Sequence, residues 1–504
     1  MAIEGSIASA AGGLSCWPDF SYSKNQANKF SSQRSLRAQA TKGSGREIVR
    51  YKTSTIRSTL VMARIIPFRG ILYDPKKTPD LKAVITPPYD VISETEQEAY
   101  YKKHPQNMIR LVLGKVYPED NDHNNRYTRA AQFFRSWLDQ GILRQDTTPA
   151  FYLTEIDYRM DGEVHTRSGF IALVKLESFE KRTILPHEQT FSATKADRFK
   201  LMKACRANFC PIFSLFPDPE NEIFRVLRSG VKRLQPDFDF EDEKGYRHRL
   251  WRVKDQQIHE KIGERLTDRS LYIADGHHRY ETALKYRDYI MSQQPTLASD
   301  DPCNFVMMYL SSMHDAGLAI RPVHRVLCDV EKAVTEAFVH RAHAYFDIET
   351  LDFDSLNGKQ AEEAFLAKVR TDANSSVIGA ALQGRKSFYV LRLKEGIMDH
   401  LFGREIPGPL RKLDVTMVTK LVLQKILGLN GVALDDEQRI LYTSRADKAL
   451  DAVHTGKCAI ALILNPTRLD QIQEVSNAGL TMPRKSTYFY PKVMSGLVIN
   501  KIGD

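Results

Sequence analysis

The stretch SLYIADGHHRYETALKYRDYI, residues 270–290, decides the fold of this 504-residue chain. Residues 270–274 are mostly apolar and predict a short buried strand, whereas residues 279–291 predict a helix. Gly276 lies between them, and glycine permits a sharp turn and a close approach of the backbone. The stretch therefore predicts a strand–loop–helix unit with an Asp-Gly-His-His-Arg run where the helix begins.

This run is suited to bind an anion. The first N–H groups of a helix have no partner within the helix and carry partial positive charge, so a phosphate can be bound there. Arg279 adds a forked, permanently charged donor, and His277 and His278 add donors or an acid–base group that titrates near neutral pH. Asp275 can hold Mg²⁺ on a phosphate or accept a hydroxyl proton. We therefore expect a phosphate site around Gly276, with a carboxylate beside it.

The same run has other interpretations. Asp275 is also a good N-cap residue, and that role is compatible with a catalytic one. Zinc binding by His277 and His278 is disfavoured, because adjacent residues at a helix start point in different directions and no third ligand has metal spacing. The glycine patterns of Rossmann and P-loop sites are absent, so neither of those nucleotide-binding motifs explains the run.

Two loop segments supply further candidates. LPHEQTF (185–191) contains Glu188, which in a loop can be a general base or simply a solvated acid. The segment lacks the second histidine of H-E-x-x-H, which argues against a metalloprotease. MPRKSTYFYPK (482–492) contains Lys485 and Ser486, which either clamp a phosphate or belong to a basic strand whose side chains reach into solvent.

The beginning of the folded part predicts short strands and a rigid turn. ARIIPFRGILYD (63–74) predicts a strand, and residues 82–86 predict a second, short apolar strand. Two prolines then fix residues 87–90 in a rigid loop, because proline sets φ and lacks an N–H donor. Tyr89 and Asp90 in that loop either line a pocket or only complete the turn.

Helices and a hairpin follow. Ser93 and Glu96 have the spacing of a capping box, which predicts a helix over residues 94–103. An amphipathic helix is expected over residues 125–143. Residues 151–177 alternate apolar and polar side chains around an Asp-Gly turn, which predicts a β-hairpin.

The rest of the chain mixes the two kinds of element. Residues 219–233 and 255–267 predict helices separated by a polar loop, and strands alternate with helices from there to the end. Hairpins beside βα units argue for an α+β or mixed α/β fold. We place an N-terminal α/β part at residues 63–330 and a C-terminal α/β part at residues 331–504.

Charge is unevenly distributed along the chain. The formal net charge is +10, but residues 1–66 carry ten Lys and Arg side chains against three acidic ones. The remaining excess of positive charge is too small to imply a nucleic-acid partner. Residues 1–62 are also rich in Ser and Ala and lack the apolar core of a secretory signal, which is typical of a transit peptide, although a disordered basic tail has the same composition. We expect import into the chloroplast, with the mitochondrion as the alternative.

Membrane insertion and metal clusters find no support in the sequence. No run of about 18 apolar residues occurs, so no membrane span is expected. The cysteines are scattered, without C-x-x-C pairs or zinc spacing, which predicts buried thiols in a reduced compartment. They are Cys16, Cys205, Cys210, Cys303, Cys328 and Cys458.

Seven segments together resemble the successive motifs of domain-of-unknown-function family 1015, in order from about residue 63 to residue 498. These segments are RIIPFRGILYD, VITPPYDVIS, HPQNMIRLVLG, LPHEQTF with KADRFKLMKA, YIADGHHRYETAL, RPVHRV and MPRKSTYFYPKVMSGL. The D-G-H-H-R segment also resembles the phosphate-binding motif of the ParB/sulfiredoxin superfamily, some of whose members are free serine kinases. This implies a ParB/sulfiredoxin-like phosphate-binding unit embedded in a larger mixed-sheet fold.

The resemblance implies a function and a set of partners. A phosphate of ATP or ADP would lie on Gly276, His277, His278 and Arg279, and a carboxylate, either Glu188 or Asp275, would take the proton of a serine hydroxyl. Phosphoryl transfer needs positioning and charge neutralisation more than covalent chemistry, so such a set with Mg²⁺ would suffice. We therefore expect a kinase for a small molecule such as L-serine. The alternatives are a ParB-like nucleotide- or nucleic-acid-binding regulatory protein without kinase activity, and a phosphoester hydrolase.

Overall fold

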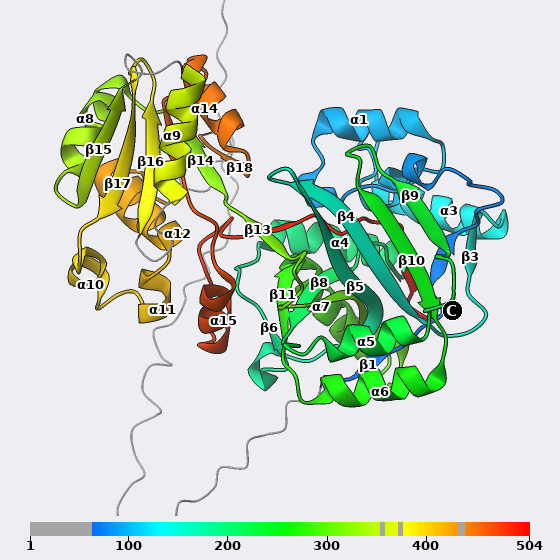
Figure 1. The fold of residues 1–504 in the computed structure, drawn as a ribbon. Coiled ribbons are helices and arrows are strands. Elements are labelled where there is room, and N and C mark those ends of the chain that lie inside the picture. The colour runs from blue at the N-terminus through cyan, green and yellow to red at the C-terminus, as the bar shows by residue number, and fades with distance from the viewer. Residues whose placement is uncertain (1–62, 353–357, 371–375, 432–438, 504) are drawn as a thin grey trace, which may run out of the picture. The chain divides into compact units, whose positions relative to one another are not determined.

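Two large β-sheets with surrounding helices make up the part of the chain that the computed structural model describes, residues 63–352, 358–370, 376–431 and 439–503. The predicted mixed α/β class is confirmed (Figure 1). The expected leader over residues 1–62, including Cys16, lies outside the described residues. The boundary placed at residue 330 stays a prediction.

The first sheet has nine strands and mixed direction. In spatial order they are β6 (Ile184–Leu185), β11 (Leu271–Asp275), β8 (Ile212–Phe216), β12 (Phe305–Ser312), β5 (Glu163–Lys175), β4 (Phe151–Met160), β10 (Arg247–Val253) and β9 (Phe238–Glu241), with β1 (Ile65–Ile66) paired to β5. β11 is parallel to β6 and β12 is parallel to β8, whereas the other pairs are antiparallel.

Helices accompany this sheet. They are α1 (Glu94–Lys103), α2 (Ile109–Val112), α3 (Arg126–Asp139), α4 (Ser192–Cys205), α5 (Glu222–Ser229), α6 (Gln256–Thr267) and α7 (His277–Gln293), with 3-10 turns η1 (Leu81–Ala83), η2 (Tyr89–Val91), η3 (Phe179–Lys181) and η4 (Pro302–Asn304). The capping box at Ser93 and Glu96 is confirmed, because each side chain accepts the backbone N–H of the other. The helix expected over residues 125–143 is confirmed as α3.

Both faces of the first sheet are buried. Successive side chains of a strand point to opposite faces, so Phe151 and Leu153 of β4 contact one core and Tyr152 contacts the other. The first core contains the apolar faces of α5, α6 and α7, and the second contains α2 and α3. All eight residues of β12 are buried, as expected for a central strand covered on both sides. The predicted hairpin is confirmed as β4 and β5, which turn at Asp161–Gly162.

The polar loop expected between α5 and α6 is wrong, because β9 and β10 lie there and extend the sheet. β10 buries His248 and Leu250, which are two residues apart and so lie on the same face of the strand. Its arginines made the segment look like a polar loop in the sequence. They form cross-strand ion pairs, among them Arg249 with Asp157 at 2.8 Å.

The single strand expected over residues 63–74 is wrong as well. Two short strands occur instead, β1 and β2 (Ile71–Tyr73), and β2 pairs with β3 (Leu143–Gln145). Gly70, at the break, donates its N–H to the Tyr152 hydroxyl at 2.6 Å and leaves no room there for a side chain. The strand expected over residues 82–86 is reduced to one bridge between Thr86 and Ser495, after η1.

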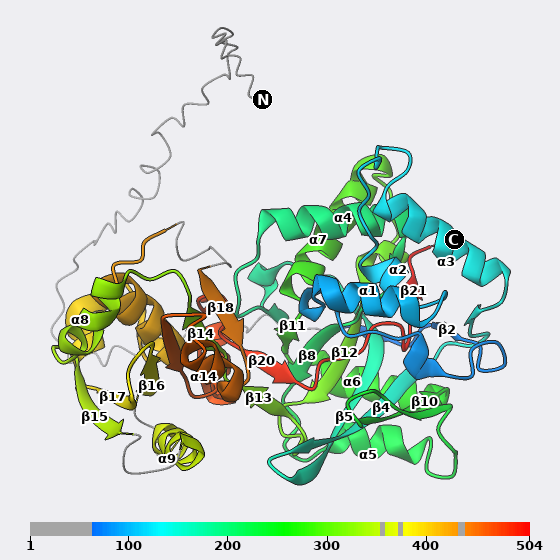
Figure 2. The ribbon, with the colours of Figure 1, turned by 90° about the horizontal axis from the view of Figure 1, so that it is seen from above.

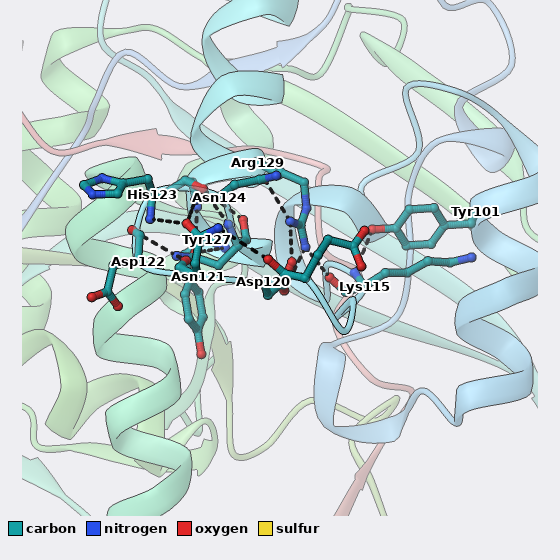
Figure 3. Close-up of polar contacts among 12 residues, drawn as sticks. Tyr101, Lys115, Asp120, Asn121, Asp122, His123, Asn124, Tyr127 and Arg129 are labelled. Atoms are coloured by element: carbon teal, nitrogen blue, oxygen red, sulfur yellow. Dashed lines mark hydrogen bonds and ion pairs between the residues drawn. The ribbon is translucent and has the colours of Figure 1, made fainter.

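A polar network holds the loop that leads into α3 (Figure 3). Arg129 donates to both oxygens of Asp120, at 2.6 and 3.0 Å, and to the carbonyl of Lys115 at 2.8 Å. The side chain of Asn121 accepts the N–H of His123 at 2.9 Å. These contacts use the polar groups of the loop to fix its path, so we assign the loop no chemistry.

The second sheet is antiparallel throughout. Its order is β15 (Phe346–Asp352), β17 (Ser387–Leu393), β16 (Val377–Leu382), β19 (Ile460–Ile463), β14 (His324–Leu327) and β18 (Ile440–Thr443). The helices of this region are α8 (Lys332–Ala342), α9 (Gly358–Arg370), α10 (Ile397–Phe402), α11 (Gly408–Arg411), α12 (Asp414–Met417), α14 (Ala446–His454) and α15 (Leu469–Asn477), with a π-helical stretch Val418–Ile426. None of the helices in the described ranges is long and apolar enough to span a bilayer.

The end of the chain returns to the first half. β20 (Tyr488–Tyr490) pairs with β13 (Ala319–Arg321), and β21 (Asn500–Lys501) pairs with β7 (Ala207–Asn208). Figure 2 shows this red segment beside strands drawn in green and cyan. The return places the MPRKST segment and the residues after it against the loop that contains Glu188.

The expectation that all cysteines are thiols is wrong for one pair. Cys328 and Cys458 form a disulfide at a sequence separation of 130. Cys328 directly follows β14, and Cys458 lies shortly before β19. These strands are antiparallel neighbours, so the sheet brings the two cysteines together without any local spacing signal. Cys205 and Cys303 are buried free thiols, and Cys210 is half-buried.

Candidate functional site

The predicted strand–loop–helix unit is confirmed by β11, Gly276 and α7. Gly276 adopts φ of +97°, in the left-handed region that favours glycine. A Cβ atom at this position would lie 2.9 Å from Cζ of Arg279. The turn therefore needs glycine for two reasons, the backbone conformation and the close approach of the guanidinium.

Asp275 lies at the centre of an ion cluster. Its Oδ1 accepts from Nζ of Lys492 and its Oδ2 accepts from the guanidinium of Arg279. All three side chains are between 11 and 14% exposed, so the pairs are shielded from water. Burial would raise the pKa of Asp275, but the two cations outweigh it and hold this pKa well below its ordinary value.

This arrangement limits what Asp275 can do. A carboxylate whose pKa is depressed and whose two oxygens both face cations is a poor proton acceptor. It is also a poor ligand for Mg²⁺, because Arg279 and Lys492 already neutralise it. No group of three or more His, Cys, Asp and Glu side chains with the geometry of a metal site occurs in the described parts of the chain. The residues present therefore do not fit Asp275 as the holder of a protein-bound metal ion.

Arg279 is less available to a phosphate than the sequence suggested. Besides Asp275, its guanidinium donates to the carbonyl of Pro211. Burial would lower the pKa of Arg279, but Asp275 outweighs burial and raises it, so the side chain stays charged. Two of its donors are used within the protein, and the positive charge of Lys492 adds to the cluster. The two cations thus outnumber Asp275, and the charge of Asp90 also acts on both of them.

His277 and His278 position a loop. Nε2 of His277 accepts the N–H of His187 at 3.2 Å, and Nε2 of His278 accepts the N–H of Phe191 at 2.9 Å. Phe191 also stacks on the ring of His278, with centroids 5.8 Å apart. Burial lowers the pKa of both histidines, so both rings are neutral at pH 7. The two side chains tie both ends of the His187–Phe191 loop to the start of α7.

His187 extends this arrangement. Its ring lies at 89° to that of His277, with centroids 4.6 Å apart, and its Nε2 lies 3.0 Å from the Thr487 hydroxyl. The ring is fully buried, and burial lowers its pKa to about 4. His187 therefore links the loop to the C-terminal segment as a neutral side chain.

Glu188 is the carboxylate that the loop presents. Its Oε1 accepts the N–H of Lys485 at 3.2 Å, and its Oε2 lies 4.0 Å from Nδ1 of His277. The side chain is 27% exposed, so a small molecule can reach it. Burial raises its pKa above the ordinary value, although the N–H of Lys485 opposes this shift. A reachable carboxylate with a raised pKa has the properties of a general base.

The MPRKST segment contributes unequally. Lys485 has φ of +54° and is exposed, and its backbone N–H is the group that holds Glu188. Ser486 is buried, and its hydroxyl donates to the carbonyl of Pro483 at 2.5 Å. The Ser486 hydroxyl is thus used inside the protein, which does not fit a phosphate ligand.

Sequence reasoning gave two members of the site no firm role. In the sequence Lys492 is only the last residue of a basic segment, and nothing in its spacing points to Asp275. The sequence allows Asp90 to line a pocket or to complete a turn. In the structure it is an exposed carboxylate whose charge acts on Arg279, Lys492 and His278. Its place after two prolines was the available signal, because rigid loops often position functional side chains.

Residues 65–416 match the family model described as "Protein of unknown function (DUF1015)". No curated protein matches the chain.

Three solved structures match this chain at low sequence identity. A conserved hypothetical protein from Pyrococcus furiosus has 12% identity over 63% of this chain and 90% of its own, with a TM-score of 0.29. A free serine kinase in complex with AMP has 12% identity over 65% of this chain and 92% of its own, with a TM-score of 0.29. SbnI with a C-terminal truncation, from Staphylococcus aureus, has 12% identity over 64% of this chain and 85% of its own, with a TM-score of 0.30. Since the family model spans more than half of the sequence, this chain belongs to the DUF1015 family of proteins of unknown function.

Proposed function

We propose that this protein is a small-molecule kinase that transfers a phosphoryl group from ATP or ADP to a hydroxyl group, with free L-serine as the first acceptor to test. One observation carries the proposal. Glu188, a reachable carboxylate with a raised pKa, is held at the start of α7 beside the cationic cluster of Lys492 and Arg279. The choice of serine rests on the resemblance of the D-G-H-H-R segment to free serine kinases.

The proposed step divides the work between two parts of the site. Glu188 removes the hydroxyl proton while the hydroxyl oxygen forms a bond to the terminal phosphorus atom. The bond between that phosphorus and the bridging oxygen breaks, and ADP or AMP leaves with the electron pair on this oxygen. Lys492 and the N–H groups at the start of α7 stabilise the negative charge on the transferring group. Mg²⁺ enters as the counter-ion of the nucleotide substrate, without a ligand from Asp275.

The raised pKa of Glu188 suits it to this step. A base accepts a proton more readily as its pKa approaches the working pH, provided that it remains mostly ionised. Asp275, whose pKa is depressed, keeps Lys492 and Arg279 in place, and His278 keeps the loop in place. We therefore assign the role of base to Glu188 and positioning roles to the other two.

The test measures product formation by the full chain. Protein is incubated with the magnesium complex of ATP or ADP and a panel of hydroxyl-bearing amino acids, and phosphorylated products are identified by mass spectrometry. We expect phosphoserine from the wild type and far slower formation by Glu188→Gln, which keeps an acceptor for the N–H of Lys485. Glu180→Gln, an exposed carboxyl of η3, is the matched control and retains activity. Nucleotide binding without product favours a regulatory binding protein, and free phosphate without an acceptor favours a hydrolase.

A further inference from the structure

A cavity of about 480 Å³ adjoins the candidate site. Lys492 belongs to both, because its side chain lines the cavity and its Nζ donates to Asp275. The volume lies within the range of about 300–1,000 Å³ that is usual for small-molecule sites. An acceptor as small as serine would leave most of this space empty.

The walls of the cavity come from four separate segments. They are the Pro87–Val91 loop with the residues before it, α1, the turn between β9 and β10, and residues 488–494. Lys103 of α1 pairs with Glu243 of the turn at 2.9 Å, which ties two of these walls together. The rigid proline loop and the C-terminal segment thus form parts of one cavity wall. The catalytic step alone does not require this wall.

The lining combines apolar and aromatic surface with lysine and acidic side chains. Ile85, Pro87 and Met494 supply apolar surface, and Tyr100 and Tyr488 supply rings. Burial raises the pKa of Tyr100 to about 12, so its hydroxyl remains a hydrogen-bond donor at neutral pH. Flat aromatic ligands with polar edges fit such a lining, because rings offer large contact area and hydroxyls fix orientation.

We propose that this cavity holds the nucleoside part of a nucleoside di- or triphosphate, with the phosphates directed to Lys492. The assignment rests on the proposed function, in that the phosphates would meet the same cationic cluster. A nucleobase and a ribose need more room than the acceptor does, and this cavity provides that room next to Lys492. Glu188 then remains open to the acceptor from another side of the cluster.

The test fills the cavity from an exposed position. Ala99 of α1 is exposed and lines the cavity, so Ala99→Trp reduces its volume with little effect on the core. Thr95, one turn earlier, is exposed and does not line it, so Thr95→Trp is the matched control. Binding of ADP and of inorganic pyrophosphate to the full chain is measured by calorimetry. We expect Ala99→Trp to weaken ADP binding by about tenfold or more and to leave pyrophosphate binding unchanged, with no change in the control.

The outcomes separate this proposal from the proposed function. If ADP binding is unaffected in Ala99→Trp, or if ADP and pyrophosphate weaken equally, the nucleoside assignment is overturned while the kinase proposal stands. If the wild type binds ADP and Ala99→Trp weakens it but no product forms, the assignment stands and the kinase proposal fails. If the wild type binds neither ligand, both fail.

A second measurement needs no variant. Photolabelling of the wild-type chain with 8-azido-ADP, followed by peptide mapping, is expected to mark peptides from residues 85–103 or 488–494, the two segments that supply many of the residues lining the cavity. Labelling that is confined to other peptides overturns the assignment.

Discussion

The backbone N–H of Phe191 donates to Nε2 of His278 at 2.9 Å, across 87 positions of sequence. The adjacent His277 makes the same kind of contact with the N–H of His187. The paired histidines therefore act on the protein's own backbone, and through it they determine where Glu188 lies. This explains why two histidines stand side by side at a helix start without sharing a ligand.

The positioning role of His278 can be separated from acid–base catalysis. His278→Gln keeps a side-chain acceptor for the N–H of Phe191, whereas His278→Ala removes it. We expect His278→Ala to lower kcat/KM by about tenfold or more, because even a small displacement of the catalytic carboxylate of Glu188 slows the reaction. We expect His278→Gln to retain most of the activity. Hydrogen exchange at Phe191 should speed up in the alanine variant only. Equal loss in both variants, with unchanged exchange, would instead identify His278 as an acid or base.

Local signals in the sequence were sufficient for several elements. Ser93 and Glu96 predicted the start of α1, and the Asp161–Gly162 turn predicted the hairpin, because capping and tight turns depend on residues close in sequence. The D-G-H-H-R run likewise predicted the unit of β11 and α7.

Contacts between distant residues were beyond these signals. The ion pair of Lys492 with Asp275 spans 217 positions, and no spacing rule connects the two. The strand β10 was missed because its arginines looked solvated, although Arg249 and its neighbours are paired across the sheet. The proximity of Cys328 and Cys458 likewise follows from the order of β14 and β19 rather than from local sequence.

The pH dependence of turnover should report Glu188. A general base must be ionised to act, so activity falls as the pH drops through its pKa. Burial raises that pKa, and the acid limb of kcat/KM should therefore lie above the ordinary glutamate value of 4.5. In Glu188→Gln we expect kcat to fall by about 10²–10⁴-fold and this limb to vanish. A limb at the ordinary value, or one that persists in the variant, would exclude Glu188 as the base.

Asp275 should contribute to stability in a pH-dependent way. Its pKa is lower in the folded protein than in the unfolded chain, so its contribution is present above the ordinary value of 3.8 and is lost as the pH falls below it. Asp275→Asn leaves Arg279 and Lys492 without their shared partner, and we expect it to lower the free energy of unfolding by about 3–5 kcal/mol at pH 7. Denaturant unfolding measures this difference.

The control for Asp275 is Asp268→Asn, which changes an exposed carboxylate just before β11. We expect its free energy of unfolding to stay within about 0.5 kcal/mol of the wild-type value. The deficit of Asp275→Asn should also shrink as the pH falls below 3.8, because the carboxyl of the unfolded wild-type chain then becomes protonated while the folded one stays ionised. A deficit that is independent of pH in this range would contradict the ion cluster.

A pair of glycines allows the close approach of Arg279 to be measured on its own. Gly276 and Gly162 have similar φ values, +97° and +87°, but a Cβ atom at Gly162 would meet nothing within 4 Å. Both alanine substitutions impose strain of about 1–2 kcal/mol, because the left-handed region is unfavourable for L-residues. Only Gly276→Ala also pushes against the guanidinium of Arg279. We expect it to lower the free energy of unfolding by at least about 1 kcal/mol more than Gly162→Ala and to weaken pyrophosphate binding, whereas Gly162→Ala leaves binding unchanged. Equal effects of the two substitutions on unfolding and binding would show that the folded-back guanidinium is not fixed against this turn.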